Sequence, residues 1–203
     1  MRYNVRTHSL LHLGALVLLL ATTGQRSLLG QQAGRAGSGE PNRPPVGLTL
    51  TSPAFVDGGD IPSKFTSADP IGLNPRLEWT NVPPGTAAFA LIVHDADVSI
   101  QKTTEDVLHW LMFNIPGSAR DLAEGLPREA RLADGTVQGK NLRGTPGYLG
   151  PGGLARPFHH YLFELFALDA VLDLGPDATR ATVLQRMDGH ILGKAMLAGR
   201  FHR

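Results

Sequence analysis

The sequence predicts a mainly β domain, an antiparallel sandwich of two sheets with one or two helices near its C-terminal end. Its 203 residues include 24 glycines and 15 prolines, about a fifth of the chain, without the period of a collagen. This content indicates many turns. Short apolar runs lie between the turn signals, and one late segment has helical spacing, a pattern typical of a β-sandwich rather than of βαβ units.

Four segments are predicted to be strands. Residues 48–51 alternate between apolar and polar side chains, and residues 89–93 form a continuous apolar run, as in a strand buried on both faces. Residues 107–115 and 160–168 are rich in aromatic and branched side chains, which favour strands. The long segment 135–157, rich in glycine and proline, is predicted to be a loop.

A helix is predicted over residues 179–187. Ala181, Leu184 and Met187 recur there at a spacing of three, and Gly189 provides a stop signal.

The N-terminal residues resemble an export signal rather than part of the fold. Arg2 and Arg6 precede an apolar run over residues 10–21, which small residues follow. A basic start, a short apolar core and small residues are typical of a secretory signal peptide, predicted over residues 1–24. The run is short for a membrane span, so an uncleaved anchor is the less favoured alternative.

Residues 25–46 are predicted to form a flexible tether, because they are rich in glycine, glutamine and proline and lack apolar periodicity. The folded domain is then predicted over residues 47–203. The whole chain is expected to be secreted or periplasmic, with no stable membrane span after processing.

Charge and cysteine content exclude several classes of function. Residues 1–46 hold five arginines and one glutamate, whereas the rest of the chain holds 14 basic and 17 acidic side chains. The domain therefore has no basic surface for a phosphate backbone, and nucleic acid is not an expected partner. The absence of cysteine excludes disulfides, zinc–thiolate sites, thiol nucleophiles and a lipid-modified cysteine.

Three predicted strands each place one ionisable residue on an apolar face. Alternation puts Asp95 in phase with the apolar residues of 89–93, His109 in phase with Leu111 and Phe113, and His159 in phase with the aromatic residues that follow it. Burying such groups unpaired costs several kcal/mol, so they are expected to meet each other or a ligand. A satisfied core cluster and a functional pocket both remain open, and Asp97, two positions beyond Asp95, favours the pocket.

Ordered motifs along the domain resemble the phosphatidylethanolamine-binding protein family, in its bacterial branch described as Raf-kinase-inhibitor-like. The resemblance spans residues 48–201. The motifs that carry it are Asp95-Ala96-Asp97-Val98-Ser99, His109-Trp110, Phe113-Asn114-Ile115-Pro116, Gly139-Lys140-Asn141, Gly147-Tyr148-Leu149-Gly150-Pro151, Phe158-His159-His160-Tyr161-Leu162-Phe163 and Met187-Asp188-Gly189-His190-Ile191-Leu192.

The resemblance implies an antiparallel two-sheet fold with a small anion pocket at one edge. It implies a pocket formed by Asp95, His109, His159 and Tyr161 and completed by the backbone around Gly150 to Gly152. Backbone N–H groups of a glycine-rich loop can hold an anion, two imidazoles can donate hydrogen bonds to it, and the carboxylate would orient a histidine.

The chain departs from the family pattern at three places. Ala96 and Ser99 replace prolines, residues 152–154 lack a proline pair, and Val107 stands where relatives often have an aromatic residue.

The leading functional hypothesis is an exported, non-catalytic binding protein with no cofactor, whose ligand is a small anion or phospholipid head group. A protein partner, such as a protease or a kinase-type target, and a role as inhibitor or regulator remain open. Two alternatives are a metal-dependent enzyme with a two-histidine, one-carboxylate site and a surface-acting inhibitor or scaffold with a vestigial pocket.

Overall fold

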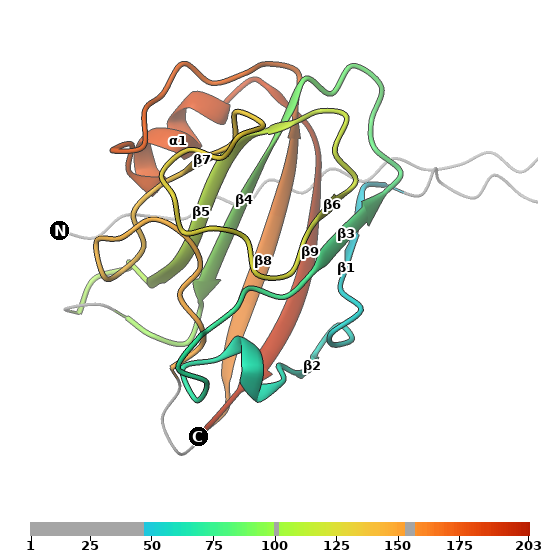
Figure 1. Cartoon of the computed structure of the whole chain (residues 1–203). Helices are drawn as coiled ribbons and strands as arrows, with labels where there is room; N and C mark the ends of the chain where they lie inside the picture. The colour runs from blue at the N-terminus through green and yellow to red at the C-terminus, as the bar shows by residue number, and fades with distance from the viewer. Residues whose placement is uncertain (1–46, 100–101, 153–156) are drawn as a thin grey trace, which may run out of the picture. The chain divides into compact units, whose positions relative to one another are not determined.

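A computed structural model describes residues 47–99, 102–152 and 157–203. These residues fold into two β-sheets and one α-helix (Figure 1). In chain order the elements are β1 (Thr49–Thr51), β2 (Gly59–Asp60), a 3-10 turn (Ser63–Phe65), β3 (Leu77–Thr80), β4 (Ala88–Asp95), β5 (Val107–Pro116), β6 (Asp121–Leu122), β7 (Val137–Gln138), β8 (His159–Leu168), α1 (Arg180–Met187) and β9 (Ile191–Phe201).

The larger sheet has six strands in the order β2-β9-β8-β4-β5-β7, and the smaller has three in the order β1-β3-β6. All pairs are antiparallel except β2 with β9. The antiparallel register brings the end of β4, the starts of β5 and β8, and the end of β9 to one edge of the sheet (Figure 1).

Two apolar clusters cover the two faces of the larger sheet. The first lies between the sheets, where Leu50 and Trp79 of the small sheet pack with Phe89, Leu91 and residues of β8 and β9. The second lies on the opposite face and includes the buried residues of α1. The predicted two-sheet, mainly β fold is therefore confirmed.

The four predicted strands and the predicted helix are all present, but five strands were missed: the two-residue strands β2, β6 and β7, and also β3 and β9. β3 is only four residues long. β9 has eleven residues, yet its inward positions include Ala195 and Gly199, which give little apolar signal. A Cβ at Gly199 would lie 2.5 Å from Cγ1 of Ile61, so the packing that forms this strand depends on a glycine that sequence patterns treat as a break.

A β-bulge at His109 corrects the predicted phase of β5. Val93 pairs with Trp110 and His94 pairs with Leu108, so His109 is an extra residue on its strand. The alternation changes there, and Leu111 lies in the cluster beside α1 rather than between the sheets. The expected alignment of His109 with Leu111 and Phe113 on one face was therefore wrong.

Of the three helix residues predicted to share one face, the helix buries only Met187. Val183 and Met187 are buried, whereas Leu184 is 42% exposed and Ala181 is exposed. The helix begins where the Thr179 hydroxyl accepts a hydrogen bond from the N–H of Thr182, as an N-cap does.

The predicted signal peptide over residues 1–24 and the tether over residues 25–46 lie outside the described residues. Within the described part of the chain, no helix has the length and apolar character needed to span a membrane.

Candidate functional site

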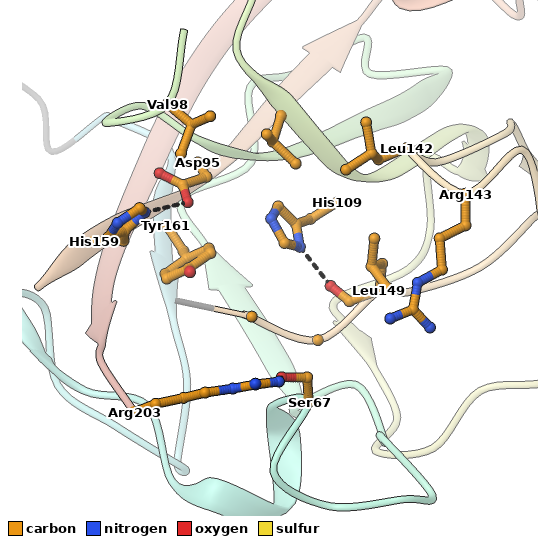
Figure 2. Close-up of a pocket in the computed structure, with 13 residues that line it drawn as sticks. Ser67, Asp95, Val98, His109, Leu142, Arg143, Leu149, His159, Tyr161 and Arg203 are labelled. Atoms are coloured by element: carbon orange, nitrogen blue, oxygen red, sulfur yellow. Dashed lines mark hydrogen bonds and ion pairs between the residues drawn. The ribbon is translucent and has the colours of Figure 1, made fainter. Parts of the chain in front are cut away.

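A cavity of about 450 Å³ opens at the sheet edge where β4 ends and where β5 and β8 begin (Figure 2). The structure brings six of the seven predicted site residues into its lining. The lining consists of Ser67, Asp95, Val98, Val107, His109, Leu142, Arg143, Leu149, Gly150, Gly152, His159, Tyr161 and Arg203.

Asp95 and His159 form a buried pair on neighbouring strands. The Nδ1 atom of His159 lies 2.7 Å from Oδ2 of Asp95, and the residues are 8% and 3% exposed. The other oxygen of Asp95 accepts a hydrogen bond from the backbone N–H of Asp97 at 3.0 Å. Both carboxylate oxygens are thus engaged, and Nε2 is the ring nitrogen of His159 that remains for a ligand.

His109 lies at the bulge of β5 and lines the cavity, and a hydrogen bond to the backbone fixes its tautomer. The Nδ1 atom of His109 lies 2.7 Å from the carbonyl oxygen of Leu149, which can only accept, so this nitrogen carries a proton. Burial lowers the pKa of His109 more than that hydrogen bond raises it. His109 is therefore neutral near pH 7, with a lone pair on Nε2, and its ring stands edge-on to Tyr161 at 5.1 Å.

The glycine-rich loop lies close against the 3-10 turn and forms one wall. A Cβ at Gly150 would lie 2.8 Å from the carbonyl carbon of Thr66 and 3.0 Å from the carbonyl oxygen of Phe65. The Tyr148 hydroxyl donates to Phe65 at 3.0 Å, and the N–H of Ser67 donates to the carbonyl of Pro151 at 2.8 Å. Only glycine at position 150 permits this approach.

Asp97 is the predicted site residue that the structure places outside the lining. Its Oδ2 accepts hydrogen bonds from the backbone N–H and the ring of His160, at 2.6 and 2.8 Å. Partial burial raises the pKa of Asp97, but these two hydrogen bonds lower it more, so the pKa is below its usual value. The carboxylate thus ties the segment after β4 to the start of β8 and is not part of the cavity lining.

Sequence reasoning missed both arginines of the lining. Arg143 comes from the glycine-rich segment, and Arg203 donates to the Ser67 hydroxyl at 2.9 Å. No motif or periodicity marked these residues, because long-range folding alone brings them to the cavity. Residues 153–156, which include the Leu154 of the predicted pocket loop, lie outside the described residues.

The geometry does not favour the metal-site alternative. Among the described residues, no three histidine or acidic side chains are arranged to hold a metal ion. Asp95 is committed to His159 and to backbone, and the Nδ1 proton of His109 is committed to Leu149.

Comparison with known proteins identifies the fold and its relatives. Residues 51–202 match the family model described as phosphatidylethanolamine-binding protein. A UPF0098 protein of Methanothermobacter thermautotrophicus is 43% identical over 159 residues, covering 77% of this chain and 99% of the relative. A UPF0098 protein of Aquifex aeolicus is 36% identical over 158 residues, covering 77% of this chain and 89% of the relative.

A solved structure shares the architecture. Escherichia coli YbcL, described as a member of the mammalian PEBP family, matches with a TM-score of 0.69 and 25% identity, covering 78% of this chain and 99% of its own. The resemblance found in the sequence is therefore confirmed: the chain belongs to the phosphatidylethanolamine-binding protein family.

Proposed function

We propose that this chain is an exported, non-catalytic binding protein whose cavity holds a small anion, in the class of phosphate, carboxylate and phospholipid head groups. The observation that carries the proposal is the buried pair of His159 and Asp95 beside the glycine-rich wall. Asp95 fixes the imidazole through Nδ1, so Nε2 donates a hydrogen bond to an anion when the ring is protonated.

His109 complements His159 in this role. Its neutral ring offers a lone pair on Nε2, which accepts a hydrogen bond from a protonated oxygen of the ligand. His159 as a donor and His109 as an acceptor match a hydrogen phosphate, which has unprotonated oxygens that accept and a protonated oxygen that donates.

A binding role agrees with the contacts of Ser67, the serine of the described lining, which are not those of a nucleophile. The Ser67 hydroxyl accepts a hydrogen bond from Arg203, and no described contact joins it to an imidazole. A serine nucleophile needs an adjacent general base, and this arrangement does not supply one.

Export is supported by the sequence of residues 1–24, and a folded domain over residues 47–203 is supported by the family match, which begins at residue 51. Expression in a bacterium with an intact export pathway, followed by mass determination of the intact product, tests both. We expect cleavage near Gly24; an uncleaved chain in the cytoplasm would contradict export.

Calorimetric titration of the untagged protein with inorganic phosphate and with acetate tests the anion site. We expect binding of both, and a loss of about tenfold or more in affinity for His159→Gln, because a charge-assisted hydrogen bond is removed. His190→Gln is the matched control, since His190 also contacts an aspartate through Nδ1, at 2.7 Å from Asp169, but precedes β9 at the opposite edge.

Two results would overturn the proposal. One is the absence of anion binding, or an affinity that His159→Gln leaves unchanged. The other is stoichiometric metal in the purified protein together with a metal-dependent reaction.

A further inference from the structure

Two arginines reach the cavity without a carboxylate partner among the described residues. Arg203 donates to the neutral Ser67 hydroxyl, and no described acidic group contacts the guanidinium of Arg143. Arg180 and Arg200, by contrast, each pair with an aspartate, Asp106 and Asp60 respectively. Distant segments of the chain therefore contribute two guanidinium groups to the cavity, and neither has a side-chain ion pair in the part of the chain that the structure describes.

An apolar surface adjoins these charges. Val98 and Leu142 lie on one side of the cavity, and Arg203 and Ser67 lie on the other (Figure 2). Leu142 is 56% exposed and belongs to the lining, so a ligand that contacts it removes apolar area from water. The two sides together match a molecule that has an anionic end and an apolar end.

The described lining offers no unpaired acidic side chain for a ligand ammonium group. Asp95 is the only acidic side chain in the described lining, and its two oxygens are bonded to His159 and to the N–H of Asp97. An ammonium group in the cavity would also be repelled by the charges of Arg143 and Arg203. The cavity thus discriminates against zwitterionic head groups.

We propose that Arg143 and Arg203 make the cavity selective for a phosphate monoester that bears an apolar group, over phosphate alone and over phosphorylethanolamine. The proposal rests on the anion site proposed above and narrows its ligand class. Guanidinium groups bind phosphate oxygens in a bidentate manner, and His159 completes the contacts to the phosphate. Val98 and Leu142 receive the apolar group.

The test is calorimetric titration of the whole, untagged chain with butyl phosphate, inorganic phosphate and phosphorylethanolamine at one pH and ionic strength. We expect butyl phosphate to bind about tenfold more tightly than either other ligand, because buried methylene groups add affinity and an unpaired ammonium reduces it. This ranking separates a monoester with an apolar group from free phosphate and from a zwitterionic head group.

Substitutions assign the selectivity to particular residues. Arg143→Gln and Arg203→Gln should each weaken butyl phosphate binding by about tenfold, and Arg143→Lys should restore only part of it, because lysine lacks the fork of donors. Leu142→Ser should reduce the preference for butyl phosphate over inorganic phosphate. Arg186→Gln, at an exposed position of α1, is the matched control.

Different results would contradict the proposed selectivity and the proposed anion site. If His159→Gln weakens anion binding but both arginine variants bind like the unmodified protein, the selectivity is wrong and the anion site stands. Equal or tighter binding of phosphorylethanolamine also overturns the selectivity. If no anion binds at all, both proposals fall.

Discussion

His109 and Leu149 exchange two hydrogen bonds between β5 and the glycine-rich wall. The ring of His109 donates to the carbonyl of Leu149 at 2.7 Å, and the N–H of Leu149 donates to the carbonyl of His109 at 2.9 Å. The same contact that joins the wall to the sheet therefore fixes the tautomer of a cavity histidine.

This relationship predicts that binding of an anion that carries no proton of its own is accompanied by proton uptake. Burial lowers the pKa of His109, so the ring is neutral near pH 7 in the free protein. An anion beside Nε2 would favour protonation and raise that pKa, so affinity should increase as the pH falls from 8 to 6. Sulfate is the suitable probe, because it does not titrate in this range, and calorimetry in buffers of different ionisation enthalpy measures the uptake.

A His109→Gln variant is the control for proton uptake. Glutamine can still donate to the carbonyl of Leu149 but does not titrate, so the uptake should decrease. An unchanged uptake in this variant would assign the proton to another group.

Asp95 and Asp97 are predicted to differ in their effect on binding. Asp95→Asn should weaken anion binding by about tenfold, because the buried carboxylate that orients His159 is lost. Asp97→Asn should change affinity by less than about threefold, because Asp97 contacts His160 outside the lining. Titration of both variants with phosphate compares their affinities. A larger loss for Asp97→Asn would contradict the assignment of Asp95 as the carboxylate that orients the cavity histidine.

The sequence predicted the elements with strong local signals. The apolar run that became β4 and the segment before Gly189 that became α1 are readable because burial and helix stop signals act over a few residues. β9 was not predicted, since two of its three buried positions, Ala195 and Gly199, are small, and Gly199 packs on Ile61, more than a hundred residues away in the chain.

The site was predictable to the extent that it lies on regular strands. Alternation placed Asp95 correctly, because β4 continues regularly up to it, but the phase of β5 could not be read through the bulge at His109. Arg143 and Arg203 carry no periodic signal, since charged side chains on loops and chain ends are ordinary in any sequence.

Gly150→Ala is predicted to destabilise the domain. The added Cβ would lie within 3.0 Å of backbone atoms of Phe65 and Thr66, which cannot move as a side-chain end can. We expect a loss of about 1–3 kcal/mol in the free energy of unfolding, measured by urea denaturation. Gly175→Ala is the matched control, because nothing lies within 4 Å of its added Cβ, and its effect should stay within about 0.5 kcal/mol.

A network of charged side chains surrounds His94. On the face of β4 opposite Asp95, His94 contacts Asp106 through Nδ1 at 2.5 Å and Glu164 through Nε2 at 3.3 Å. Partial burial lowers the pKa of His94, but the hydrogen bonds to Glu164 and Asp106 raise it more, so the pKa lies above its usual value. The hydrogen bond from His94, together with Lys194, holds the pKa of Glu164 at about 2.

Because folding raises the pKa of His94, its contribution to stability is complete below the unfolded value of about 6.5 and is lost as the pH rises through the folded value. His94→Gln should therefore cost about 1–3 kcal/mol at pH 5.5 and clearly less at pH 9, measured by urea denaturation at both values. His190→Gln removes a histidine from an ion pair whose two side chains are 47% and 45% exposed, and should cost little at either pH. A cost for His94→Gln that is equal at both pH values would show that His94 does not carry the additional proton in the folded protein.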